Sequence, residues 1–300
     1  MRKAFVDTLL DWGESKESPY LLTGDLGYSV LEPFRKAFPD NFINVGIMEQ
    51  SMISFGSGLQ LRTQKPVFIY SINNFVTFRA LEQLRLDVGY HNLGICIVGV
   101  GSGFQYQTAG YSHWGIEDLS AVASLETFVI STPADSQGVK TEIQRFLNAP
   151  KPTYLRLGKL EKELKNFNTK EDYPGFRQNG HGPRYIFTHG SLTSKIVNHH
   201  FFSPEKFTLV TFDRIPEFEE LSLINLVKKA GSISVIEEVV FSGSLGSRIS
   251  RIIAEHRINV EFTWTGINGS TLKSAGGDID FLRNRELGNN YLEKILSLDE

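Results

Sequence analysis

The chain has 300 residues, of which 41% are hydrophobic and 22% are charged, and its formal net charge is -3. The length favours two domains, and the composition is that of a globular protein with ample apolar residues for buried cores. The charge argues against non-specific nucleic-acid binding, because no basic excess exists to neutralise phosphates. No apolar run reaches the roughly 18 residues of a membrane helix, and the N-terminus lacks the apolar region of a signal peptide. We therefore expect a cytoplasmic protein that binds neither nucleic acid nor membrane.

Alternating strand and helix patterns fill the first half of the chain. After an opening amphipathic helix around residues 5–12, short apolar runs predict strands at 20–23, 42–45, 67–70, 94–98, 128–131 and 153–157. Helical periodicity lies between them, at 31–38, 49–61, 75–88, 117–124 and 136–148. This alternation predicts a mostly parallel sheet with helices on both faces.

A polar stretch rich in glycine and proline interrupts this pattern after residue 158. It shows no sustained periodicity, so we interpret it as a linker. A second alternation follows, with strands expected at 185–188, 207–211, 232–237 and 259–263, and helices at 192–200, 218–229, 245–256 and 289–296. The sequence thus predicts two three-layer α/β domains, a larger one at residues 1–160 and a smaller one at 184–300, joined by a linker at 161–183.

The stretch from Asn41 to Leu61 passes from a β-rich run through Gly46 into an amphipathic helix, with Glu49 at the joint. In an open α/β sheet, ligands bind at the carboxyl ends of the strands. A carboxylate in the first helical turn also complements the positive end of the helix dipole. The pattern alone leaves both roles open for Glu49.

The segment from Gly99 to Asp118 is a long loop with several glycines, several aromatic residues and His113. Loops longer than about 12 residues in a compact domain are usually functional or disordered, and disordered segments are poor in aromatic residues. The glycine spacing fits neither GxGxxG nor a P-loop. We therefore expect a functional loop that is not a nucleotide-binding motif.

The metal-binding potential of the chain is low. Cys96 is the only cysteine and lies in an apolar run, which predicts a buried, inert thiol. No HExxH or paired-histidine motif occurs. We expect no metal site formed by this chain alone.

Residues 38–50, FPDNFINVGIMEQ, resemble the pyrimidine-binding domain of thiamin-diphosphate enzymes of the transketolase family. Further segments are similar to that family in collinear order: TGDLGYS at 23–29, KPVFIYSINNFVTFRALEQLRLDV at 65–88, GYSHWGIED at 110–118, PTYLRLGK at 152–159 and, from its C-terminal domain, SVIEEVVFSGSLGSRI at 234–249. The resemblance covers nearly the whole chain. It implies the C-terminal half of a split transketolase.

The resemblance implies a catalytic role for Glu49, which would hydrogen-bond N1′ of the cofactor's aminopyrimidine and help to activate it. An apolar surround of Ile47, Met48, Met52 and Phe55 would give it a semi-buried setting, with Ile47 also lining the cofactor.

Other residues match cofactor-lining positions of the family. Phe75 is the expected stacking partner of the flat aminopyrimidine, and Phe78 is the next candidate. Asp25 and Leu26 match positions near the thiazolium ring, although Gly24-Asp25 also has the composition of a plain turn.

Three further residues match substrate-binding positions. The resemblance implies that His113 is catalytic and contacts substrate oxygens, and that Arg156 and Ser29 lie near a sugar phosphate. A structural loop histidine and an ordinary salt bridge are the alternatives for His113 and Arg156. Ala109 stands where transketolases usually have an aspartate that binds a substrate hydroxyl, so the donor sugar stays open.

No segment resembles the GDG…N motif that binds the diphosphate and Mg²⁺ in this family, and Gly276-Gly277-Asp278 lies in the wrong context. The resemblance therefore implies an N-terminal transketolase subunit that carries this motif, an α2β2 assembly and an active site at the interface. The pair would transfer a two-carbon ketol unit from a ketose to an aldose, with sugars or sugar phosphates as substrates.

Three alternatives remain. The β subunit of a 2-oxoacid dehydrogenase has the same two-domain plan, although the histidine loop lacks that family's QHS pattern. Residues 38–50 also resemble 1-deoxyxylulose-phosphate synthases, which are normally unsplit. Ala109 keeps open a non-catalytic structural subunit.

Overall fold

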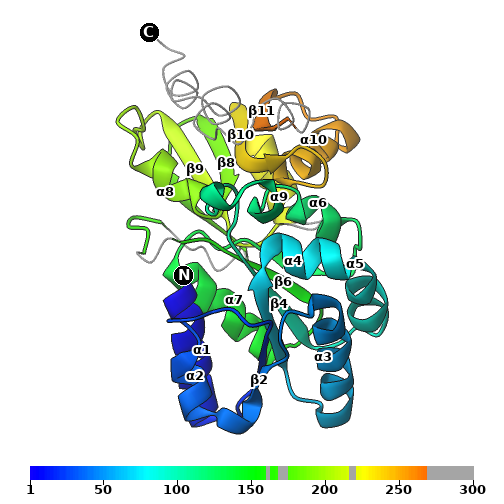
Figure 1. The fold of residues 1–300 in the computed structure, drawn as a ribbon. Coiled ribbons are helices and arrows are strands. Elements are labelled where there is room, and N and C mark those ends of the chain that lie inside the picture. The colour runs from blue at the N-terminus through cyan, green and yellow to red at the C-terminus, as the bar shows by residue number, and fades with distance from the viewer. Residues whose placement is uncertain (160–162, 168–174, 216–220, 269–300) are drawn as a thin grey trace. The chain divides into compact units, whose positions relative to one another are not determined.

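The computed structural model describes residues 1–159, 163–167, 175–215 and 221–268. It divides into two compact units, residues 1–163 and 164–300. Each unit contains its own sheet (Figure 1). The helix expected at 289–296 and the Gly276-Gly277-Asp278 segment lie outside the described residues. Within the described ranges, no helix combines the length and apolarity needed to cross a membrane.

The first unit contains a six-stranded sheet in which every pair of neighbouring strands is parallel. The strand order is β2-β1-β3-β4-β6-β5, and the bounds are β1 Tyr20–Thr23, β2 Phe42–Asn44, β3 Val67–Ile72, β4 Ile95–Val100, β5 Val129–Ser131 and β6 Thr153–Leu157. The predicted parallel sheet is therefore confirmed. Because all strands run the same way, the loops that follow them emerge at one edge.

Helices cover both faces of this sheet, with α1 and α7 on one face and α3 on the other (Figure 1). The helices of the unit are α1 Arg2–Ser15, α2 Glu32–Ala37, α3 Glu49–Thr63, α4 Asn73–Thr77, α5 Leu81–Gln83, α6 Asp118–Ala123 and α7 Ser136–Asn148. On the α1/α7 face, Phe68 of β3 contacts Phe5 of α1 and Phe146 of α7 edge-on, at centroid distances of 5.7 and 5.0 Å. Such aromatic contacts fix the helix layer on the sheet.

The single helix expected at 75–88 is instead broken into short pieces. Helix α4 is followed by a 3-10 turn at Phe78–Ala80, by α5 and by a π-helical turn at Leu84–Tyr90. The Thr77 hydroxyl donates to the carbonyl of Asn73 at 2.7 Å, a back-bond that bends helices. Ala80 has φ -120° and ψ 20°, which is not helical. This break positions the side chains of the segment relative to α3.

The second unit contains a five-stranded sheet in the order β11-β10-β8-β9-β7. Only β7 runs antiparallel to its neighbour β9, and the other pairs are parallel. The elements are β7 Phe176–Gly180, β8 Arg184–His189, α8 Leu192–Val197, β9 Phe207–Phe212, α9 Leu221–Lys229, β10 Ser232–Val240, α10 Leu245–Glu255 and β11 Glu261–Ile267. Ile186, Phe207 and Ile236 lie in one buried cluster of its core. Both units are thus α/β, as predicted.

Strand β7 corrects one expectation, because it lies inside the range 161–183 that the sequence assigns to a linker. Its arginine is buried in an ion pair with an aspartate. Arg177 donates to both carboxylate oxygens of Asp213, with Nε 2.6 Å from Oδ2 and Nη2 2.9 Å from Oδ1. Because this strand buries an arginine, its sequence lacks the alternation of apolar and polar residues that predicts a strand.

Candidate active site

The loop that follows β2 leads directly into Glu49. The side chain of Asn44, the last residue of β2, accepts hydrogen bonds from the amides of Gly46 and Asp25, each at 3.0 Å. Gly46 has φ +77°, a conformation that favours glycine. Asn44 therefore ties the loops after β1 and β2 together and fixes the turn that starts α3 at Glu49.

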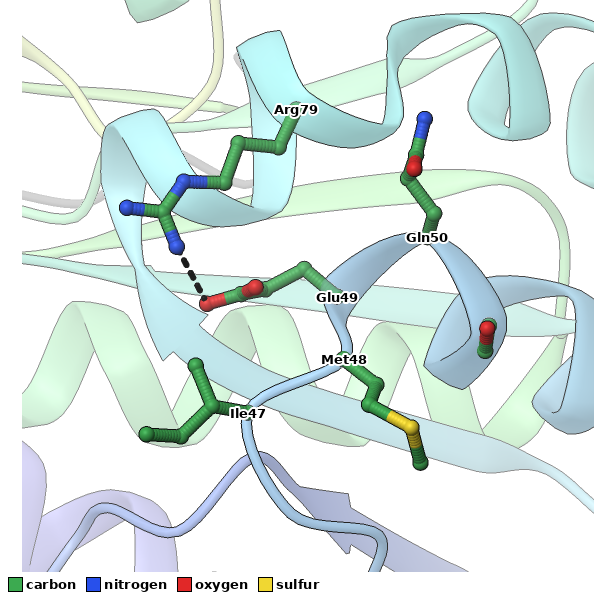
Figure 2. Close-up of a pocket in the computed structure, with 6 residues that line it drawn as sticks. Ile47, Met48, Glu49, Gln50 and Arg79 are labelled. Carbon is green, nitrogen blue, oxygen red and sulfur yellow. Dashed lines mark hydrogen bonds and ion pairs between the residues drawn. The ribbon is translucent and has the colours of Figure 1, made fainter.

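Glu49 is one of the residues that line an open pocket (Figure 2). Its side chain is only 5% exposed, and Arg79 Nη1 donates to its Oε1 at 3.1 Å. The pocket has a volume of about 440 Å³ and is lined by Ile47, Met48, Glu49, Gln50, Ser51 and Arg79. The structure thus places a buried carboxylate against solvent-accessible space at the edge of the sheet where ligands of α/β proteins bind.

The expected apolar surround of Glu49 is mostly exposed to solvent. Ile47, Met48 and Phe55 are 71%, 51% and 48% exposed, and only Met52 is buried. Helix α3 presents a different face to the sheet, made of Glu49, Met52, Ile53, Gly56 and Ser57. Gly56 allows that contact, because a Cβ there would lie 2.8 Å from Ile69 Cδ1. Glu49 is therefore buried by the approach of its helix to the sheet, and Ile47 is exposed on the pocket rim.

Of the two candidate stacking rings, Phe75 is the one that the structure connects to Glu49. The guanidinium carbon of Arg79 lies 3.7 Å from the centroid of the Phe75 ring, and the same arginine binds Glu49. The His113 ring meets Phe75 edge-on at 4.9 Å. Phe78 lies three residues further along and is half exposed. The structure brings Glu49, Phe75 and His113 together through Arg79.

The loop after β1 carries Asp25, Leu26 and Ser29. Asp25 has φ 56° and accepts a hydrogen bond from the Tyr28 hydroxyl at 2.7 Å, which raises the pKa of Tyr28. The Leu26 carbonyl accepts from Thr23 at 3.0 Å, and its side chain packs partly against the core. The Ser29 amide donates to Glu32 Oε1 at 2.8 Å. These contacts describe an ordered turn joined to the Glu49 loop through Asn44.

The long loop after β4 carries His113 two residues before Gly115. Gly103 and Gly115 pair through both backbone groups, at 2.7 and 2.9 Å, and close its base. Ser112 Oγ lies 2.9 Å from His113 Nδ1, which leaves Nε2 as the ring nitrogen for another partner. Ala109, in place of the family's usual aspartate, is exposed in the same loop.

Arg156, which the resemblance places near a sugar phosphate, is bound by residues of the chain itself, as the alternative of a salt bridge has it. It is buried, and its Nε donates to Asp118 Oδ2 at 2.8 Å, while Nη2 donates to the Gly115 carbonyl and to Asp118 Oδ1. Asp118 also accepts from Tyr154 and Asn73, at 2.5 and 3.0 Å. Burial and the Asp118 charge raise the pKa of Tyr154 well above its usual range. Arg156 thus anchors the loop that carries His113.

Neither Arg79 nor Lys159 was assigned a role in the site from the sequence. The sequence signal that could have identified Arg79 is its positive charge within the aromatic segment 75–80. Lys159 is exposed just after β6, and its Nζ donates to the Gln105 carbonyl at 2.9 Å. It lies 5.2 Å from the Tyr106 ring, which in turn lies 6.4 Å from the His113 ring. Lys159 therefore places a positive charge in the neighbourhood of the histidine.

The described part of the chain contains no group of three or more histidine, cysteine, aspartate or glutamate residues arranged to hold a metal ion. The Glu49 pocket is lined by one carboxylate and one guanidinium. This donor set suits a hydrogen-bonding organic group, because metal sites gather several oxygen, nitrogen or sulfur ligands.

Residues 1–163 match the family described as "Transketolase, pyrimidine binding domain". The chain belongs to the transketolase family. A transketolase C-terminal section from Methanocaldococcus jannaschii is 28% identical over 290 residues, which cover 93% of this chain and 89% of that protein. One subunit of the apulose-4-phosphate transketolase from Actinobacillus succinogenes is 30% identical over 254 residues, which cover 82% of this chain and 80% of that protein.

The fold is that of a split transketolase. The solved structure described as "Split gene transketolase, inactive beta4 tetramer" superposes with a TM-score of 0.77, covering 100% of this chain and 98% of that chain, at 23% identity. The order of two α/β units in one chain, inferred from the sequence, is therefore confirmed as the transketolase arrangement.

Proposed function

We propose that this chain is the C-terminal subunit of a thiamin-diphosphate-dependent transketolase, which transfers a two-carbon ketol unit from a ketose to an aldose acceptor. One observation carries the proposal: the buried carboxylate of Glu49 lines a pocket and binds Arg79, whose guanidinium lies over Phe75, and Phe75 in turn contacts His113. When bound, the cofactor supplies a carbon nucleophile that cleaves the ketose C2–C3 bond.

The residues of the pocket fit the aminopyrimidine half of that cofactor. In its N1′-protonated or imino form such a ring donates a hydrogen bond from N1′, so it needs an acceptor there and an aromatic face for stacking. Glu49 provides the acceptor and holds a proton at N1′, and Phe75 provides the face, with Phe78 as the neighbouring alternative. Ile47 covers the pocket rim, where it is available to exclude water from a bound ring.

The loops around the pocket bind the rest of the cofactor and the substrate. Asp25 and Leu26 line the thiazolium side, and Ser29 faces the sugar phosphate. His113 donates or accepts through Nε2 at the substrate oxygens, since Ser112 holds Nδ1. Lys159 supplies positive charge near His113, a role that the buried Arg156 does not fill in this structure.

The partner is an N-terminal transketolase subunit that holds the diphosphate and Mg²⁺, in an α2β2 complex in the cytoplasm. Two observations support this proposal. The relatives named as a transketolase C-terminal section and as a transketolase subunit share 80 to 89% of their length with this chain. The name of the second relative also includes that of a sugar phosphate, apulose-4-phosphate, which supports sugar phosphates as the substrate class of this chain.

The test is ketol transfer by the two subunits together, with sugar phosphates as donor and acceptor. The change Glu49→Gln should lower kcat by about a hundredfold or more, because loss of an acid–base group typically costs 10²–10⁴ in rate. Glu14→Gln, an exposed carboxylate on α1, is the matched control and should leave kcat unchanged.

The same assay separates the alternatives. Decarboxylation of pyruvate without ketol transfer would indicate a 2-oxoacid dehydrogenase or a 1-deoxyxylulose-phosphate synthase. Absence of turnover by the wild-type pair would indicate a structural subunit. Full activity of the Glu49→Gln variant would refute the catalytic role of Glu49.

A further inference from the structure

Arg79 connects three residues that the proposed function uses. Its Nη1 lies 3.1 Å from Glu49 Oε1, its guanidinium carbon lies 3.7 Å from the centroid of Phe75, and Phe75 contacts His113 at 4.9 Å. Figure 2 shows the guanidinium reaching across the pocket from the helical segment above to the carboxylate at the start of α3. The family resemblance of the sequence motifs implies no role for Arg79.

The carboxylate of Glu49 needs such a partner. With its side chain 5% exposed, Glu49 has lost most of its hydration, and a buried carboxylate without a counter-charge is strongly unfavourable. Within the described part of the chain, Arg79 is the cation that binds it. Arg79 is itself 47% exposed, so the pair lies at the boundary between protein and pocket.

The hydrogen bond from Arg79 uses one of the two carboxylate oxygens of Glu49. Oε1 accepts from Arg79, and among the described residues Oε2 has no hydrogen-bond donor. A carboxylate can accept at both oxygens at once. The arrangement leaves Oε2 available for a donor that enters the pocket.

Phe75 fixes the other side of the guanidinium. Arg79 follows Phe75 by four residues, and its planar group lies over the ring, a cation–π contact that suits arginine better than lysine. The stacked guanidinium has less freedom to rotate, so it holds Oε1 in one direction. The orientation of the Glu49 carboxylate then depends on the Phe75 ring as well as on Arg79.

We propose that Arg79 is a positioning residue, which holds Glu49 by Oε1 so that Oε2 accepts the N1′ hydrogen of an aminopyrimidine that is protonated at N1′ or in its imino form. This inference rests on the proposed function. A guanidinium that instead occupied the place of the aminopyrimidine would compete with it. The two arrangements predict opposite effects on ring binding when Arg79 is shortened or neutralised.

The test measures binding of 4-amino-5-hydroxymethyl-2-methylpyrimidine to the full chain by ligand-observed NMR at millimolar concentrations. Arg79→Met should weaken binding about tenfold, because the carboxylate of Glu49 loses the charged hydrogen bond that orients it. Arg79→Lys keeps the positive charge but not the planar guanidinium, so its affinity for the pyrimidine should lie between those of the wild type and Arg79→Met. Arg85→Met removes a different exposed arginine from the same segment, one that pairs with Glu82, and should leave binding unchanged.

A chemical rescue separates positioning from a general effect on folding. Methylguanidinium added to Arg79→Ala should restore binding of the pyrimidine, whereas methylammonium should restore less. Arg79→Met and Arg79→Ala leave the buried carboxylate of Glu49 without its counter-charge, so their thermal unfolding should shift to lower temperature. A cooperative transition that persists in each variant shows that the chain still folds under the conditions of the binding assay.

Binding by Arg79→Met that equals or exceeds that of the wild type overturns the inference, and a tighter complex identifies Arg79 as a competitor. Glu49→Gln keeps this result distinct from failure of the proposed function. If Glu49→Gln weakens binding and Arg79→Met does not, only the role of Arg79 is lost. If the wild type and Glu49→Gln bind the pyrimidine equally, or neither binds it, the proposed site and this inference fall together.

Discussion

The guanidinium of Arg156 lies against the carboxylate of Asp118, with Nε 2.8 Å from Oδ2 and both side chains buried. The same carboxylate accepts hydrogen bonds from Tyr154 and Asn73. Asp118 therefore joins β6, the start of α4 and the end of the loop that carries His113. A buried charge with this many partners fixes the position of the loop from which His113 contacts Phe75.

We expect substitution of Arg156 to lower the free energy of unfolding rather than to weaken substrate binding. Arg156→Met leaves Asp118 buried without its counter-charge, so we expect a loss of about 3–5 kcal/mol in the free energy of unfolding. Urea denaturation measures this loss, and the exposed Arg85→Met should change it by less than about 0.5 kcal/mol. Unchanged stability together with a raised KM for a phosphorylated sugar would return Arg156 to the phosphate-binding role that the sequence suggested.

Local patterns were sufficient to predict the strands of the first unit and the joint at Glu49. Apolar runs of strand length are encoded by neighbouring residues, and so is the start of α7, where the side chain of Asp135 accepts from the Gly138 amide at 2.9 Å. The parallel order of the sheet follows from the alternation of these elements. This part of the fold depends on sequence within a few residues of each element.

Contacts between distant residues could not be predicted in the same way. Arg156 and Asp118 are 38 residues apart, and a family motif that places an arginine at a strand end does not specify its partner. The pairing of Glu49 with Arg79 spans 30 residues and was missed for the same reason. The exposure of Phe55 was mispredicted because helical spacing fits more than one face of α3, and Gly56 determines which face approaches the sheet.

Tyr111 should make the stability of the first unit sensitive to alkaline pH. Its hydroxyl donates to Glu117 Oε1 at 2.5 Å, and this hydrogen bond, with partial burial, raises the pKa of Tyr111 from 10.0 to about 12. The folded state therefore favours the protonated phenol. The resulting stabilisation is fully present below pH 10 and is lost as the pH rises toward about 12.

The comparison of wild type with Tyr111→Phe isolates this effect. The difference in their free energies of unfolding, measured in urea at pH 8, 10 and 11, should be constant up to about pH 10 and then shrink. Phenylalanine keeps the ring contact with Trp114, at 5.9 Å between centroids, so packing is matched. A difference that stays constant to pH 11 would show that the hydroxyl does not bind Glu117.

Cys96 should be unreactive in the folded chain. It lies on β4 and is buried, and burial, with the nearby charge of Glu142, raises the pKa of its thiol well above the usual range. Thiol reagents attack the thiolate, which is scarce and inaccessible here. At pH 8, Ellman's reagent should modify the native chain at least about a hundredfold more slowly than the chain in urea, where one thiol per chain should react. Rapid reaction of the native chain would mean that β4 opens readily.

Glu237 should be a principal determinant of stability in the second unit. Its carboxylate is buried at the N-terminus of α10, where it accepts from the amides of Leu245 and Gly246, each at 3.0 Å, and from the Ser244 hydroxyl at 2.6 Å. The Trp264 indole on β11 donates to the same carboxylate at 2.7 Å. Glu237 therefore links β10, β11 and α10.

Glu237→Ala leaves these donors buried without an acceptor, and each unsatisfied donor costs about 1–3 kcal/mol. We expect Glu237→Ala to lower the free energy of unfolding of the second unit by more than about 3 kcal/mol. Glu237→Gln should lower it by less, because glutamine keeps the side-chain volume and one acceptor oxygen. The neighbouring Glu238→Gln is the control, because Glu238 is more exposed and its ion-pair distance to Lys195 is 3.8 Å. Hydrogen exchange of the α10 amides is the decisive measurement, since it reports this unit without requiring that both units unfold together. Equal protection of α10 in Glu237→Ala and in the wild type would mean that the helix is held by its apolar face alone.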